Sequence, residues 1–153
     1  DLHSTSRRQR QMCIRDREII MKKYPNAILT LNSAFYYYGL TDTIPDHYYV
    51  ATPKSNRKIE DVRVKQIYEN SNAFEMGKTT IEYDGVDITI YNEERLLIEL
   101  IRNKRKFSFD LYKEIISNYR KLIHKMDMTQ IMEYAYELPK TNMVMETIRL
   151  EIL

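Results

Sequence analysis

The sequence is poor in cysteine and has no long run of apolar residues. One cysteine in 153 residues excludes a framework of disulfide bonds. No apolar run approaches the roughly 20 residues that a membrane-spanning helix needs. With 43% apolar and 30% charged residues, the composition is that of a globular protein. Because no signal peptide is recognisable either, we expect a cytoplasmic protein that has no membrane partner.

Histidine is also scarce, and its distribution does not suggest a zinc site. His47 and His124 each stand apart from cysteine and from a second ligand at a metal-binding spacing. The run Gly77-Lys78-Thr79 matches only the end of a phosphate-binding loop. Asn72 stands where that motif needs its first glycine, and a strand rather than a helix is expected to follow. We therefore expect no catalytic, metal-binding or cofactor-binding residues.

The excess of basic residues is confined to one end of the sequence. The whole chain carries a formal charge of +2, but residues 1–17 contain five Arg and two Asp, so residues 18–153 carry −1. Residues 1–17 lack a hydrophobic period and resemble translated sequencing-adapter sequence, so we expect a non-native, disordered tail. The alternative is a natural basic tail that binds nucleic acid. Without this segment, net charge gives no indication of nucleic-acid binding.

The strongest local signals surround Asp84-Gly85. This pair supplies the positive φ angles of a two-residue hairpin turn, and the flanking residues alternate as strands do. The pattern predicts strands over Thr79–Tyr83 and Val86–Tyr91, followed by a helix that Asn92 caps. The apolar face of this helix is too broad for a surface helix, so we expect it to be buried against the sheet. Its apolar residues are Leu96, Leu97, Ile98, Leu100 and Ile101.

A second helix is expected nearer the start of the chain. The pattern predicts a helix over Leu29–Leu40, with Thr30 or Asn32 as its cap and Gly39 as its C-terminal stop. The run Asn70–Asn72 is expected to be a break between elements.

Shorter patterns predict the remaining elements. Strands are expected over His47–Ala51 and Val62–Tyr68. Three amphipathic helices are expected after residue 107, namely Ser108–His124, Met128–Leu138 and Thr141–Leu153. The order predicts an α+β fold, with a small antiparallel or mixed sheet, an N-terminal helix and a C-terminal group of three to four helices.

Acidic side chains cluster along the hairpin and the helix that follows it. A metal-dependent nuclease needs two or three carboxylates around one ion, with a lysine nearby. Asp84 is used by the turn, and Glu93 and Glu94 suit the positive end of the helix dipole. The nuclease is therefore an alternative rather than the main hypothesis. The full set is Glu82, Asp84, Asp87, Glu93, Glu94 and Glu99.

Basic side chains occur in two short stretches. Each stretch is either a solvated surface or half of one patch that contacts nucleic acid or an acidic partner. A stand-alone nucleic-acid-binding module is thus another alternative. The nine residues are Lys54, Arg57, Lys58, Arg63, Lys65, Arg102, Lys104, Arg105 and Lys106.

Three motifs together resemble the AbiEi antitoxin family of abortive-infection, type IV toxin–antitoxin systems. They are S-A-F-x-x-x-G-L-T at Ser33–Thr41, P-x-x-x-Y-V-A at Pro45–Ala51, and G-V-x-I-x-I-Y-x-x-E-R-L-L-I-E-L at Gly85–Leu100. The third is the most specific, because its turn, strand, cap and Glu-Arg pair occur in a fixed order. The resemblance covers about residues 22–153.

The resemblance implies a non-enzymatic antitoxin of phage defence. It implies neutralisation of a cognate AbiEii-like nucleotidyltransferase toxin, by a route that need not involve a stable complex. Promoter binding and autoregulation would belong to an upstream winged helix-turn-helix domain, of which residues 18–28 would be a remnant, and residues 29–153 would form the antitoxin domain. Arg95 occupies a family-like position, where it is either a contact residue or part of a structural ion pair.

Overall fold

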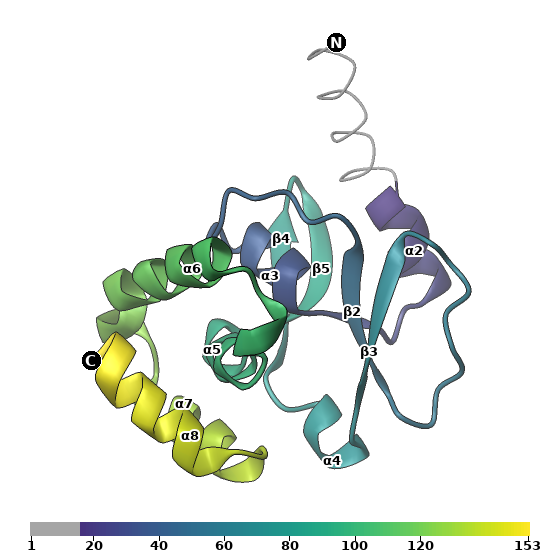
Figure 1. Ribbon diagram of the computed structural model, residues 1–153. Helices are drawn as coiled ribbons and strands as arrows, with labels where there is room; N and C mark the ends of the chain where they lie inside the picture. Colours follow the sequence, from purple (N-terminus) through teal and green to yellow (C-terminus); the bar gives the residue numbers. More distant parts are fainter. Residues whose placement is uncertain (1–15) are drawn as a thin grey trace.

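A five-stranded mixed sheet lies on one side of the molecule and the C-terminal helices lie on the other (Figure 1). The computed structural model describes residues 16–153. The strand order is β3-β2-β1-β5-β4. The β1–β5 and β2–β3 pairs are parallel, whereas β1–β2 and β4–β5 are antiparallel. The strands are β1 (Ile28–Leu29), β2 (Tyr48–Pro53), β3 (Val64–Glu69), β4 (Lys78–Tyr83) and β5 (Val86–Tyr91).

Helices precede the sheet, interrupt it and follow it. The helices before β4 are α2 (Arg17–Lys23), α3 (Leu31–Tyr37) and the short α4 (Ser71–Phe74). The later helices are α5 (Glu93–Arg102), α6 (Phe109–Leu122), α7 (Met128–Glu137) and α8 (Thr141–Thr147), which a π-helical segment, Ile148–Ile152, continues. The predicted α+β class, mixed sheet, N-terminal helix and C-terminal helical group are confirmed.

The hairpin and its capped helix form as predicted. Asp84 and Gly85 have φ angles of 52° and 78°, which a two-residue turn with two left-handed positions requires. Asn92 caps α5, because its side chain accepts a hydrogen bond from the Arg95 N–H at 2.8 Å. Ser108 and Asp127 cap α6 and α7 in the same way.

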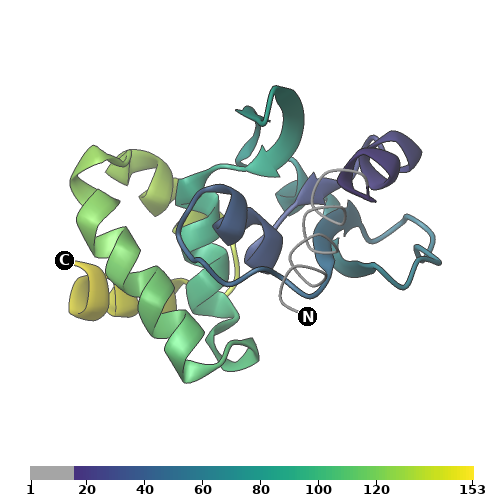
Figure 2. The same ribbon diagram turned by 90° about the horizontal axis from the view of Figure 1, so that it is seen from above.

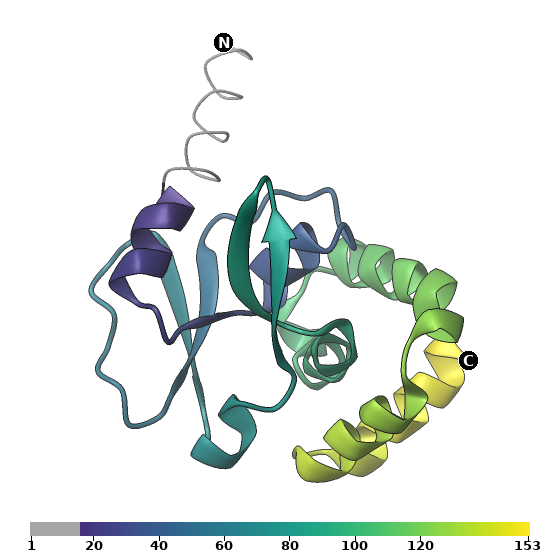
Figure 3. The same cartoon turned by 180° about the vertical axis from the view of Figure 1, so that it is seen from behind.

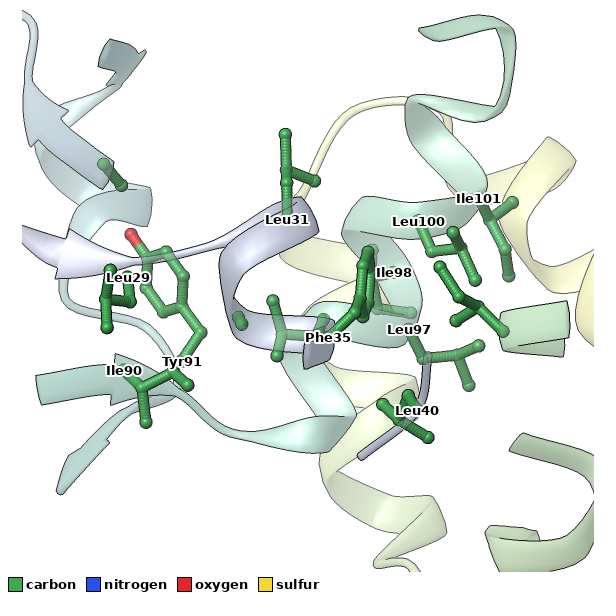
Figure 4. Packing of buried hydrophobic residues seen from close by; sticks show 14 of the residues in the cluster. Leu29, Leu31, Phe35, Leu40, Ile90, Tyr91, Leu97, Ile98, Leu100 and Ile101 are labelled. Atoms are coloured by element: carbon green, nitrogen blue, oxygen red, sulfur yellow. The ribbon is translucent and has the colours of Figure 1, made fainter. Parts of the chain in front are cut away.

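The surroundings of α5 differ from the prediction. Every residue from Arg95 to Ile101 is buried, but the helix packs mainly against α3, α7 and α8 rather than directly on the sheet. Figures 1 and 3 show α5 nearly along its axis, between the sheet and the C-terminal helices. Its apolar face is broad because helices cover it from more than one side. Figure 4 shows Phe35 of α3 beside Ile98 and Leu97 of α5, with Leu29 and Ile90 of the sheet on the other side of α3, and all five belong to one core.

The predicted helix over Leu29–Leu40 is wrong at its start. Leu29 belongs to β1, where it pairs with Val50 on one side and Ile90 on the other. A strand of two residues shows no alternation, so its place in the centre of the sheet could not be read from its own pattern. The helix starts at Leu31 and stops as predicted, because Gly39 has a φ of 74°. The expected break at Asn70–Asn72 overlaps α4.

The helix α2 is held in place by Arg17. Arg17 is 1% exposed, and its guanidinium carbon lies 5.6 Å from the ring centroid of Tyr37 and 5.4 Å from that of Tyr83. Its neighbour Asp16 accepts a hydrogen bond from Arg63 at 2.9 Å. The boundary expected at residue 17 therefore falls inside α2. The rest of the expected tail, residues 1–15, lies outside the described residues.

Candidate binding cleft and the Arg95 centre

Arg95 connects α5 to the turn between β3 and β4. Its side chain is fully buried. Nη1 donates to the carbonyl oxygens of Ala73 at 2.6 Å and Met76 at 2.8 Å. Nε donates to Glu99 Oε1 at 3.0 Å, and the guanidinium lies over the Tyr91 ring at 4.5 Å. One side chain thus fixes α4, the end of β5 and its own helix. We call this set of contacts the Arg95 centre.

The buried carboxylate of Glu99 and the partly buried carboxylate of Glu69 balance the guanidinium charge. Glu99 also accepts from Arg102 at 2.7 Å and from the Asn103 side chain at 3.2 Å, so it is well supplied with donors. Glu69 Oε2 lies 3.6 Å from Arg95 Nη2. Burial, together with the nearby charge of Glu99, raises the pKa of Glu69, and the Arg95 charge opposes that rise. The centre is a buried ion network, in which removal of Arg95 leaves Glu69 without its nearest cation and Glu99 with Arg102 alone.

Gly77 leaves the space that Arg95 occupies. A Cβ atom at Gly77 would lie 2.6 Å from Arg95 Cβ and 3.1 Å from Asn92 Oδ1. Gly77 also has a φ of 82°, a backbone angle that residues other than glycine rarely adopt. Its carbonyl oxygen accepts a hydrogen bond from the Asn92 N–H at 2.7 Å. The glycine therefore lets the β3–β4 connection pass directly against the first turn of α5.

A cleft of about 710 Å³ lies beside the Arg95 centre. Its walls come from the segment that follows β2, from α4 and its flanking residues, and from the C-terminal end of α7. Ala73 and Met76, whose carbonyl groups Arg95 holds, are part of the wall. The polar lining comprises Lys54, Ser55, Asn70, Ser71, Asn72 and Glu137. Hydroxyl, amide and single charged groups of both signs are suited to hydrogen bonding with a polar partner.

The predicted basic residues do not act as one group of free charges. Lys54 follows the end of β2, whereas Arg63 precedes β3, and because the two strands are parallel these residues lie at opposite ends of the sheet. Arg63 is engaged with Asp61 and Asp16. Arg102 is engaged with Glu99, and Lys104 with Glu151 at 3.4 Å. Seven of the nine basic residues are exposed, and Lys104 is among them despite its ion pair. They are Lys54, Arg57, Lys58, Lys65, Lys104, Arg105 and Lys106. Of the nine, only Lys54 lines the cleft.

The acidic residues are likewise distributed among separate structural roles. Glu82 and Asp87 face each other across the hairpin. Glu94 Oε1 accepts from the Asp127 N–H at 3.2 Å, which joins the starts of α5 and α7. Glu99 belongs to the Arg95 centre. Within residues 16–153, no three His, Cys, Asp or Glu side chains are arranged to hold a metal ion.

Sequence reasoning did not identify the cleft. Its polar residues belong to segments about 70 to 80 positions apart, from Lys54 and Asn70 to Glu137, and none forms a local motif. For Arg95 the sequence leaves a contact residue and a structural ion pair as alternatives, and in the structure its buried side chain forms an ion pair with Glu99.

The chain matches no protein-family model, and a search of curated proteins finds no match either. Among the helices of residues 16–153, none combines the length and the apolar character needed to cross a bilayer.

The pair of Asp61 and Arg63 predicts a pH dependence of stability. Three hydrogen bonds from Arg63, through its backbone N–H, Nε and Nη2, lower the pKa of Asp61 to about 2. Because the pKa is about 3.9 in unfolded chains, the ionised carboxylate stabilises the fold above about pH 4, and this stabilisation is lost as the pH falls towards 2.

We therefore expect Asp61→Asn to lower the free energy of unfolding at pH 7 by up to about 1 kcal/mol. The variant should also lose less stability than the wild type between pH 4 and about pH 2. Urea unfolding at several pH values measures both effects. Glu60→Gln, in the same loop and exposed, is the matched control and should follow the wild-type profile. Parallel profiles for Asp61→Asn and the wild type would contradict the assignment.

Proposed function

We propose that this chain is the antitoxin domain of an AbiEi-like protein, which acts by binding and counteracts an AbiEii-like nucleotidyltransferase toxin. The main support is the position of the third motif. Its residues form the hairpin turn, β5, the Asn92 cap and Arg95. Of these, Arg95 binds the carbonyl groups of Ala73 and Met76 in one wall of the cleft. The motif on which the resemblance rests thus coincides with the structural centre of the domain.

The alternative of a metal-dependent nuclease receives less support from the same geometry. That hypothesis requires Asp87 and Glu94 beside a lysine in an open cleft. Asp87 lies opposite Glu82 on the hairpin, and Glu94 binds the Asp127 N–H. Neither lines the cleft, and Lys54 is the one lysine that the described part of the chain contributes to its lining. Cytoplasmic location, promoter autoregulation and DNA contact through an upstream domain belong to the antitoxin proposal.

Co-expression with an AbiEii-like nucleotidyltransferase tests the proposal. Growth of cells that produce the toxin should be restored when the chain is produced with it, and a toxin inactivated at its nucleotidyltransferase site serves as the control for expression burden. Persistent growth arrest, with the chain shown to be folded by circular dichroism, would contradict the proposal. Cleavage of nucleic acid by the purified chain with a divalent ion would favour the nuclease instead.

Charge reversal inside the cleft tests where the activity resides. We expect Lys54→Glu to weaken growth rescue about tenfold, because one charged contact at an interface contributes on that order. Lys121→Glu, at an exposed lysine on α6 that does not line the cleft, makes the same change of charge and should rescue as well as the wild type. Equal rescue by the two variants would remove the cleft from the proposal without affecting the antitoxin assignment.

A further inference from the structure

Within residues 16–153, the strand β4 forms one edge of the sheet. In an antiparallel ladder, hydrogen-bonded and non-hydrogen-bonded residue pairs alternate. The Asn92 N–H donates to the Gly77 carbonyl, and the register continues through Thr79–Ile90 and Ile81–Ile88. Residues 78, 80 and 82 therefore direct their backbone groups away from β5. No hydrogen bond within residues 16–153 reaches the outer groups of residues 80 and 82.

The exposed side chains of β4 form a pattern that is complementary to itself. Lys78, Thr80 and Glu82 are exposed, whereas the alternating residues 79, 81 and 83 are partly buried. The positive and the negative side chain thus lie two residues to either side of Thr80. A charge on an edge strand normally prevents pairing with another strand. On β4 the two charges have opposite signs and lie at equal distances from Thr80. In an antiparallel pair of two copies, each lysine would therefore face a glutamate, which favours pairing.

We propose that β4 pairs antiparallel with β4 of a second copy, about a two-fold axis at Thr80. In this register Thr80 faces the partner's Thr80, and Lys78 faces the partner's Glu82 in each of two equivalent pairs. Directly opposed residues have Cβ atoms about 4.5–5.5 Å apart, which brings each lysine within reach of a carboxylate. The residues that face one another are those whose backbone groups point outward. Figure 2 shows the β4–β5 hairpin projecting from the body of the molecule, where a second copy can approach.

A competing contact within the chain is weak. Lys78 Nζ lies 3.5 Å from Glu75 Oε2, but the two side chains are 42% and 67% exposed. Exposed ion pairs of this kind contribute little, so Lys78 can exchange Glu75 for the carboxylate of a second copy. The backbone N–H of Lys78 stays bound to the Glu75 carbonyl, at 3.2 Å. The new ladder therefore uses the Lys78 carbonyl and both backbone groups of Thr80.

The opposite edge of the sheet lacks this complementarity. The outward residues of β3 are Val64, Gln66 and Tyr68, because the carbonyl groups of residues 63 and 69 bind β2. A two-fold axis at Gln66 would place Val64 against Tyr68, with no pairing of opposite charges. The loop before β3 also binds this strand, since the Gln66 side chain accepts from the Ile59 N–H at 2.7 Å. The pairing of two copies is therefore assigned to β4.

Sedimentation velocity over a series of concentrations tests this pairing with charge-swapped variants. The wild type should form a reversible dimer. Lys78→Glu and Glu82→Lys should each weaken dimerisation roughly tenfold or more, since each turns two attractive pairs into two repulsive ones. The double variant K78E/E82K restores both pairs and should dimerise like the wild type. An equimolar mixture of the two single variants should form a mixed dimer, because every facing pair is again opposite in charge.

Two further variants separate pairing from folding. Thr80→Pro removes an outward N–H that no partner within residues 16–153 uses, so it should abolish the dimer and leave the circular dichroism of the monomer unchanged. Lys121→Glu should leave dimerisation unchanged. A wild type that is monomeric up to millimolar concentration would overturn the inference, as would a dimer that all the β4 variants retain. The inference is independent of the antitoxin proposal, because it concerns a strand edge that does not line the cleft.

Discussion

Replacing Arg95 with alanine is expected to lower the free energy of unfolding by about 3–5 kcal/mol, which is a large part of the stability of a typical domain. The substitution removes the cation that Glu69 and the buried Glu99 share, and leaves Glu99 with Arg102 alone. It also leaves the carbonyl groups of Ala73 and Met76 without the donor that binds both. Loss of these hydrogen bonds adds to the electrostatic penalty.

Urea unfolding followed by circular dichroism measures this effect. Arg105→Ala is the matched control, because Arg105 is exposed, and it should change the free energy by no more than about 0.5 kcal/mol. Arg95→Lys keeps the charge but cannot donate from two nitrogens in one plane, so its stability should be intermediate. If Arg95→Ala unfolded at the same urea concentration as Arg105→Ala, the Arg95 centre would not stabilise the fold.

Gly77→Ala is expected to lower the free energy of unfolding by about 2–5 kcal/mol. About 1–2 kcal/mol comes from placing a side chain at a left-handed position, and about 1–3 kcal/mol comes from forcing a methyl group into a packed core. The second contribution follows from the 2.6 Å separation between the added Cβ and Arg95 Cβ. The backbone on both sides would have to move to relieve it.

Gly85→Ala isolates the conformational part of this cost. Gly85 has a φ of 78°, close to that of Gly77, but an added Cβ there would have no neighbour within 4 Å. We expect a loss of only about 1–2 kcal/mol. The difference between the two variants in urea unfolding measures the clash with Arg95. Equal losses would show that Gly77 is needed only for its backbone angle.

The parts of the fold with strong local signals could be predicted from the sequence. The Asp84-Gly85 turn, the Asn92 cap and the starts of α6 and α7 each depend on residues within four positions of one another. Turn geometry and capping are short-range physics, so neighbours in sequence are sufficient to specify them.

Features that depend on distant segments could not be predicted in this way. β1 is a strand only because Val50 and Ile90 lie on its two sides. Glu99 could be proposed as an ion partner of Arg95 from the spacing of four residues along one helix. The carbonyl groups of Ala73 and Met76 could not, since a backbone carbonyl carries no residue-specific signal. The cleft itself arises where α4 and the end of α7 approach each other.

Amide hydrogen exchange in Arg95→Lys tests most directly whether Arg95 holds the wall of the cleft. The relevant amides are those of Phe74 and Met76, which donate to Asn70 and Ala73. We predict that both exchange faster in the variant, while amides in the middle of α6 keep their wild-type rates, because lysine cannot bind both wall carbonyls. Unchanged exchange at Phe74 and Met76 would contradict the assignment of Arg95 as the residue that connects α5 to the cleft.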